Sequence, residues 1–111
     1  MPSDLLDLVA YVFGGMFLTN VIPHFVSGLM GRRFPSPFAK PPGKGQSSAM
    51  TNLLWGFFNL VVGYVLLSRV GNFDIGNWRH AAAAGVGALL VGFVCCTRFG
   101  SLNDGRGPNL A

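Results

Sequence analysis

Four asparagine and histidine side chains lie inside stretches of this sequence that are otherwise apolar. They are Asn20, His24, Asn52 and Asn59. An imidazole can transfer a proton or accept a hydrogen bond, and an amide can bind an ion or a hydroxyl group. Such groups should face other protein groups, because an unpaired amide in hydrocarbon is costly. The four residues therefore form a candidate polar cluster for a proton, an ion or a ligand, or they make hydrogen bonds that only fix helix packing.

The sequence offers few other groups for catalysis or metal binding. No carboxylate lies inside the apolar stretches, which disfavours transport that relies on a membrane carboxylate. Cys95 and Cys96 are adjacent and have no further ligands at zinc spacing, so we expect small, reduced side chains and no metal site. Nothing specific supports a pair of His24 with Ser27 or Ser47. We expect no catalytic residues and no cofactor.

The spacing of charged residues outlines the elements that must position the polar cluster. Half of the 111 residues are apolar and 11% are charged, against about 25% in a typical soluble domain. Three segments contain no charged residue and are 24, 24 and 18 residues long: 8–31, 45–68 and 80–97. A bilayer core needs roughly 20 apolar residues of helix. The pattern predicts one all-α integral membrane domain over 1–111, a small bundle of three transmembrane helices at about 5–30, 50–68 and 78–97.

Each predicted helix has one face of small or polar residues. In the second span Asn52, Gly56, Asn59 and Gly63 recur at spacings of four and three, and in the third span so do Ala81, Gly85, Ala88, Gly92 and Cys95. Small residues let helices approach closely in lipid, so we expect packing at Gly56, Gly63, Gly85, Ala88 and Gly92. Because the first two spans are antiparallel, Asn52 comes near the depth of 27–31 and Asn59 near that of Asn20, with His24 between them. The spacing therefore predicts that the four residues meet in the cytoplasmic half of the membrane. The faces predict three helices packed on each other, or an oligomer built through the same faces.

Basic residues are divided unequally between the two sides of the predicted bundle. The loop 31–49 and the polar tail 98–111 carry Arg32, Arg33, Lys40, Lys44, Arg98 and Arg106, whereas the other side carries Arg69 and Arg79. Six against two is a positive-inside bias, which predicts a cytoplasmic C-terminus and an external N-terminus. The same distribution accounts for the net charge of +4 without a nucleic-acid partner.

The segment GRRFPSPFAKPPGKGQSS at 31–48 has an unusual composition. It contains four prolines, three glycines and four basic residues. The prolines exclude a regular helix and favour extended or polyproline-like structure. Phe34 and Phe38 suit the headgroup region of a bilayer, which predicts phospholipid or anion contacts by the neighbouring cations Arg32, Arg33, Lys40 and Lys44. A protein partner is the alternative.

Three motifs together resemble a group of short bacterial integral membrane proteins to which no activity is assigned. They are N-x-x-P-H at 20–24, the loop sequence at 31–48 and N-L-L-W-G-F-F-N at 52–59. The resemblance implies a multi-pass protein of the bacterial inner membrane, and it implies no catalytic residues.

Three functions fit these observations. The first is a small non-enzymatic structural or accessory subunit whose partners are the lipid bilayer and either further copies of itself or another membrane protein. The second is an oligomeric channel or transporter for small solutes, with the polar cluster lining the cytoplasmic half of its path. The third is a membrane enzyme that acts on a lipid-like substrate, with His24 and the loop arginines Arg32 and Arg33 as its candidate residues.

Overall fold

The chain folds into three packed helices, which confirms the predicted all-α fold. The computed structural model describes residues 2–103 as α1 (Pro2–Leu29), α2 (Ala49–Val65) with its π-helical continuation η1 (Leu66–Val70), and α3 (Trp78–Asn103). Each helix has a segment long and apolar enough to cross a membrane: Asp4–Leu29, Ala49–Val70 and Trp78–Leu102. The protein is therefore a small multi-pass membrane protein with three spans.

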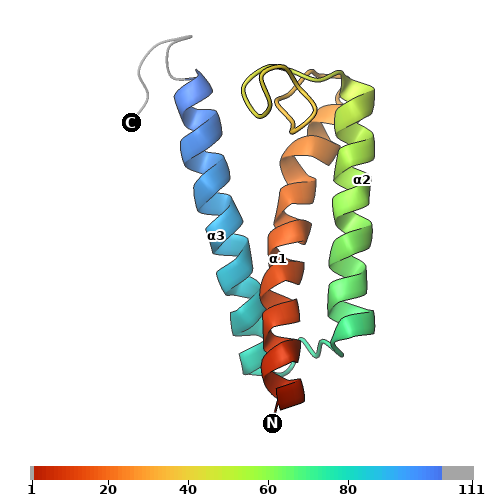
Figure 1. The fold of residues 1–111 in the computed structure, drawn as a ribbon, viewed down its shortest axis with the longest axis vertical. Helices are drawn as coiled ribbons and strands as arrows, with labels where there is room; N and C mark the ends of the chain where they lie inside the picture. The colour runs from red at the N-terminus through yellow and green to blue at the C-terminus, as the bar shows by residue number, and fades with distance from the viewer. Residues whose placement is uncertain (1, 104–111) are drawn as a thin grey trace.

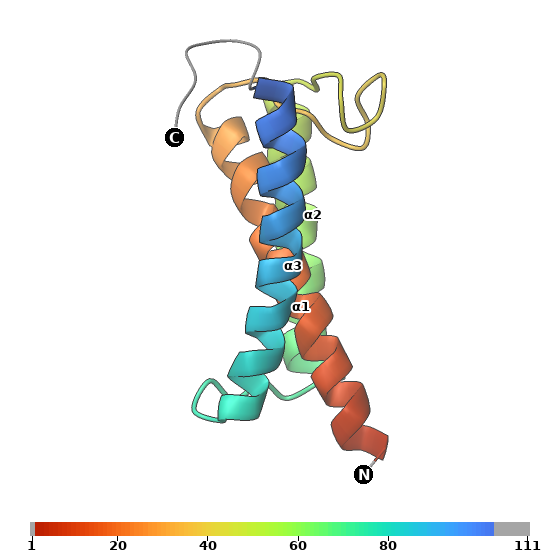
Figure 2. The same ribbon diagram turned by 90° about the vertical axis from the view of Figure 1, so that its left-hand side faces the viewer.

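Helix α1 occupies the middle of the bundle (Figure 1). It packs against both α2 and α3, whereas α2 and α3 make no close backbone contact with each other in the described part of the chain. Towards the end that carries the loop 30–48, α3 leans away from α1, and Figure 2 shows the two helices crossing. Among the helices, α3 thus packs only against α1, and no close backbone contact joins α2 to α3.

The contact between α1 and α2 uses the face of small and polar residues in α2. The buried residues of α2 are Asn52, Gly56, Asn59 and Gly63. A Cβ atom added at Gly56 would lie 2.7 Å from the backbone nitrogen of Phe25, and one added at Gly63 would lie 2.6 Å from the Leu18 side chain. The two helices approach this closely because no side chain separates their backbones.

Helix α3 packs on α1 through a different face from the one predicted. A Cβ atom at Gly87 would collide with the carbonyl oxygen of Val12 in α1. The backbone carbonyl of Ala84 also lies directly against the backbone of α1, with no room for a side chain between them. Gly85 and Gly92, in contrast, would meet nothing within 4 Å. The segment 81–88 reads AAAAGVGA, so small residues occur on nearly every side of the helix and their spacing does not select one face. Gly85 and Gly92 therefore meet no neighbour within one chain, and packing by the face that they share with Ala88 stays a prediction.

The end of α1 is fixed by Gly31, which adopts a φ of +68°. Its backbone nitrogen donates to the carbonyl of Gly28 at 3.0 Å, and that of Arg32 donates to Ser27 at 2.9 Å. This pair of bonds is a Schellman motif, in which glycine relieves the strain of a left-handed residue. The helix therefore ends where the sequence predicts, and the chain turns sharply into the basic loop.

The last helix extends beyond its predicted end at residue 97. Residues 98–103 of the predicted polar tail are helical, and 104–111 lie outside the described residues. Phe99 supplies the reason, because its ring packs on that of Phe34 in the loop with centroids 4.6 Å apart. Contact with a distant segment thus stabilises a turn that hydropathy alone would not include in the span.

Tyr11 anchors the opposite end of the bundle. It is almost fully buried, and its hydroxyl accepts a hydrogen bond from the backbone nitrogen of Asn72 at 2.9 Å. The ring of Phe73 packs edge-on against it with centroids 5.3 Å apart. The connection between η1 and α3 is therefore tied to α1 at this end.

Candidate functional site

A cavity of about 510 Å³ lies between the three helices, beneath the loop 30–48. Its walls are mostly apolar and include Phe17, Val94 and Phe99, while Asn20, His24, Ser36, Asn59 and Arg98 contribute polar groups. The volume lies in the range of pockets that hold one small ligand, about 300–1,000 Å³. Because α2 and α3 do not touch, the cavity lies where a molecule could enter from the side of the bundle.

The loop 30–48 folds back over the cavity as a cap. Phe34 and Ser47 form an antiparallel bridge, with backbone hydrogen bonds of 3.2 and 3.0 Å. The hydroxyls of Ser36 and Ser47 lie 2.6 Å apart, and the backbone nitrogen of Gly43 donates to the carbonyl of Ser36 at 2.8 Å. These bonds give the loop a compact structure in place of the extended one expected from its prolines.

The two phenylalanines of the cap have different environments. Phe34 is turned inward, with its ring centroid 5.6 Å from that of His24, so it does not lie among lipid headgroups as expected. Phe38 is 61% exposed and packs edge-on against Trp55 at 5.2 Å, a position that suits the membrane interface. The bridge to Ser47 accounts for the difference, since it fixes the direction of the chain at Phe34.

Asn52 joins the cap to α2. Its side chain is fully buried, and its amide nitrogen lies within bonding distance of three backbone carbonyls: Phe34 at 2.9 Å, Ser48 at 3.1 Å and Ser47 at 3.3 Å. A carbonyl can only accept, so the amide group of Asn52 is oriented with its nitrogen towards the loop and its oxygen towards α1.

The oxygen of Asn52 lies 2.8 Å from Nδ1 of His24. Since that oxygen accepts, Nδ1 must carry the proton of the bond. His24 is only 3% exposed, because the cap covers its side chain. Its other ring nitrogen, Nε2, has no hydrogen-bond partner among the described residues, and the ring lines the cavity.

The other two residues of the predicted cluster form a second pair. The amide nitrogen of Asn20 donates to the side-chain oxygen of Asn59 at 3.1 Å, and the amide nitrogen of Asn59 donates to the carbonyl of Trp55 at 2.7 Å. The amide oxygen of Asn20 has no partner within the described chain, and Asn20 lines the cavity. The structure thus arranges the four residues as two pairs between α1 and α2, and three of them, all except Asn52, line the cavity.

Trp55, Arg98 and Phe99 line the cavity although sequence reasoning did not assign them to a site. The indole nitrogen of Trp55 is buried and has no hydrogen-bond partner in the part of the chain that the structure describes. Trp55 lies three residues after Asn52 and four residues before Asn59, which places it near their face of α2. This spacing could have assigned Trp55 to the site from the sequence. For Arg98 and Phe99 no such signal exists, because the packing of α3 on α1 and the fold of the cap together bring them to the site.

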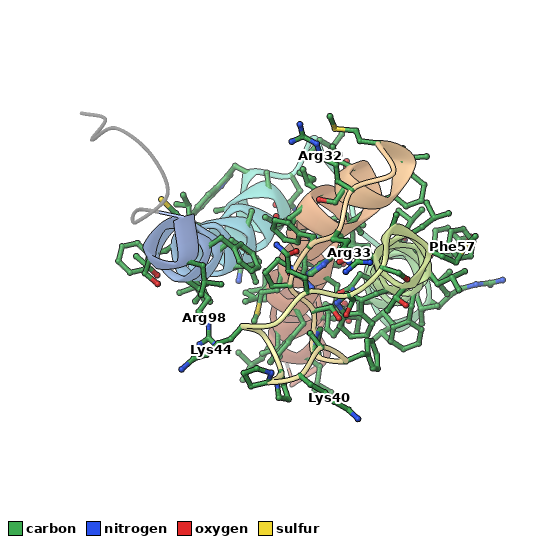
Figure 3. The ribbon with its side chains drawn as sticks, turned by 90° about the horizontal axis from the view of Figure 1, so that it is seen from above. Arg32, Arg33, Lys40, Lys44, Phe57 and Arg98 are labelled. Carbon is green, nitrogen blue, oxygen red and sulfur yellow. The ribbon has the colours of Figure 1, made fainter. Side chains whose placement is uncertain are left out.

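Basic side chains surround the cap (Figure 3). Arg32, Arg33, Lys40, Lys44 and Arg98 are all exposed. The described carboxylates, Asp4, Asp7 and Asp74, belong to the opposite end of the bundle, so none lies near these cations. A second pocket of about 350 Å³ beside the cap is lined by Arg32, Arg33 and Lys44. This end of the molecule is therefore suited to an anion.

Other chemistry finds little support in the geometry. The Ser27 hydroxyl donates to the carbonyl of Pro23 at 2.6 Å, and Ser47 bonds to Ser36, so neither serine pairs with His24. Within residues 2–103 no group of three His, Cys, Asp or Glu side chains could hold a metal ion.

Comparison with protein-family models, curated proteins and solved structures finds no match to this chain. The resemblance to short bacterial membrane proteins therefore stays a prediction. What the fold and the site define is a small three-span membrane protein with a cavity that opens between two of its helices.

Proposed function

We propose that this chain is a non-enzymatic accessory protein of the bacterial inner membrane that binds an anionic amphiphile. One apolar chain of the ligand occupies the cavity, and its headgroup contacts the basic residues around the cap. The observation that carries the proposal is the position of the cavity. Its walls are mostly apolar, and α2 and α3 make no close backbone contact beside it. Arg98 lines it, and the cap above carries four more exposed cations with no described carboxylate at this end.

The lipid phase is the natural source of such a ligand. Large apolar side chains cover the outward faces of the helices, for example Leu89 at 76% and Phe93 at 73% exposure. Phe57 points away from the bundle on the outer side of α2 (Figure 3). A chain dissolved in the bilayer can reach the cavity between α2 and α3, whereas a soluble ligand has to pass the hydrogen-bonded cap.

The cations supply the binding energy for the headgroup. Each Lys or Arg near a membrane surface contributes about 1 kcal/mol to the attraction of anionic lipid. Arg98 also lines the cavity and reaches the cap, since a Cβ atom at Gly43 would lie 3.0 Å from its guanidinium. It is therefore placed to contact a headgroup whose chain lies below. The predicted orientation puts this end in the cytoplasm.

The proposal predicts selective binding of anionic lipid. Purified protein in mild detergent is titrated with dioleoylphosphatidylglycerol or dioleoylphosphatidylcholine, and bound lipid is measured by native mass spectrometry. We expect the anionic lipid to bind at least tenfold more tightly. The double substitution Arg98→Gln and Lys44→Gln should lose most of this preference, because two charges are worth about 2 kcal/mol.

Arg69→Gln is the matched control, because Arg69 is an exposed cation at the opposite end of the molecule. It should leave the preference unchanged. Equal binding of both lipids by the wild-type protein, or equal losses in the control and the double variant, would contradict the proposed function.

A further inference from the structure

We propose that the bound amphiphile has a single chain and a free hydroxyl group beside its anionic headgroup, and that Nε2 of His24 accepts a hydrogen bond from this hydroxyl. The inference rests on the proposed function and deepens it, because it names the class of ligand. A 1-acyl-2-hydroxy-glycerophosphate has this chemistry.

The first step concerns the proton on His24. Three backbone carbonyls fix the orientation of the Asn52 amide, and its oxygen then accepts from Nδ1 of His24 at 2.8 Å. A charged imidazolium so deeply buried would need a nearby carboxylate, and the described carboxylates lie at the other end of the bundle. The ring is therefore neutral, and Nε2 carries a lone pair that can only accept.

The second step concerns the hydrogen-bonding groups that a ligand of this cavity must have. Nε2 of His24 and the amide oxygen of Asn20 are acceptors without described partners, so a ligand must bring a donor. Trp55 lines the same cavity, while its indole N–H is buried away from the cavity surface and has no partner among the described residues. A hydroxyl group can both donate and accept, whereas an ether or a fully ionised phosphate only accepts. A hydroxylated ligand gives Nε2 of His24 the hydrogen bond that the described chain does not supply.

The third step concerns size and position. His24 and Arg98 line one cavity, so a hydroxyl at His24 and an anionic group at Arg98 belong to neighbouring parts of one ligand. In a 1-acyl-2-hydroxy-glycerophosphate the free hydroxyl and the phosphate are on adjacent carbons, so two carbons separate the hydroxyl oxygen from the phosphate oxygen. The volume of about 510 Å³ is that of a pocket for one small ligand, so a second acyl chain would stay outside it.

The test uses two ligands that differ in one group. The probes are 1-oleoyl-2-hydroxy-glycero-3-phosphate and its 2-methoxy analogue, and their binding to the full-length protein in detergent is compared. Loss of one hydrogen bond corresponds to about a fivefold weakening. We expect the hydroxy compound to bind the wild-type protein about fivefold more tightly.

The substitution His24→Phe should reduce this ratio to about one, while His80→Phe at the other end of the bundle should keep it. A preference caused by the bulk of the methyl group would persist in His24→Phe and would overturn the inference. Because His24→Phe also removes a partner of Asn52 and could unfold the cap, the wild-type protein gives a second measurement.

That measurement is ¹⁵N NMR of protein labelled at its two histidines. Nε2 of His24 should resonate as an unprotonated ring nitrogen and should shift when the hydroxy compound, but not the methoxy compound, is added. A protonated Nε2, or equal shifts with both probes, would refute the inference. If neither probe binds and the arginine and lysine substitutions have no effect, the proposed function itself fails.

Discussion

At the scale of single residues, Asn52 is the side chain on which the site depends most. Its amide holds the two ends of the cap through backbone carbonyls and holds His24 through Nδ1. Side chains of similar size cannot make both kinds of hydrogen bond at this position. Leucine offers neither a donor nor an acceptor, and aspartate offers only acceptors. One buried amide therefore fixes both the fold of the loop and the tautomer of the histidine.

The substitution Asn52→Leu should lower the free energy of unfolding by about 3 kcal/mol, because it leaves several buried polar groups without partners. The cap should also open, so that trypsin cleaves the Lys44–Gly45 bond faster. Thermal unfolding in detergent and limited proteolysis measure the two effects. Gln46→Leu removes an exposed amide of the same loop and should change neither. A variant of Asn52 as stable and as resistant as the wild type would show that the amide is dispensable.

At the scale of elements, α3 is the least constrained part of the bundle. Among the helices it packs only on α1, through the level of Ala84 and Gly87, and it leans away at the end where the cavity lies. Its face with Gly85 and Gly92 is open within one chain. This arrangement leaves α3 free to serve both as a wall of the cavity and as a contact with a second copy, as the predicted oligomer requires.

Substitutions at two glycines of α3 distinguish its packing face from its open face. Gly87→Leu should destabilise the protein by about 2 kcal/mol, since even a Cβ atom there collides with the backbone of α1. Gly85→Leu should leave monomer stability nearly unchanged, because the added side chain meets open space. Thermal unfolding in detergent checks both, and equal losses would contradict the assigned faces.

At the scale of the whole molecule, charge is separated along the length of the bundle. The described acidic side chains belong to the end with Tyr11, whereas the cap end carries five exposed cations. Each helix has a span with few charges, and the apolar outer faces require lipid. The described part of the molecule therefore has one end whose exposed charged side chains are all basic, and this asymmetry underlies the proposed orientation.

Reporter fusions test that orientation. A green fluorescent protein fused after Ala111 should fluoresce in bacterial cells, and alkaline phosphatase at the same position should be inactive, because the cationic end stays in the cytoplasm. Exchanging Arg32, Arg33, Lys40 and Lys44 for glutamine should weaken the positive-inside bias. The protein should then insert in both orientations, so that both reporters are partly active. Active alkaline phosphatase on the wild-type chain would reverse the orientation and would move the proposed headgroup site to the other leaflet.

Several features could be predicted from the sequence because they depend on local pattern. Gly31 was recognisable as the end of α1, since glycine after an apolar run favours the left-handed turn. The face of α2 that packs on α1 was recognisable because polar and small residues on that helix fall on a single side. The face of α3 was not recognisable, since its small residues fall on several sides.

The sequence by itself determined that this is a three-helix membrane protein with polar residues turned inward, because a bilayer dictates the length of apolar helices and penalises unpaired amides. Only the tertiary structure decided that Asn52 pairs with His24, that Phe34 turns inward to meet Phe99, and that α2 and α3 stay apart to leave a cavity. These features depend on the crossing of helices and on contacts between segments far apart in the chain. Such contacts are set by the fit of whole surfaces, which no local spacing of residues encodes.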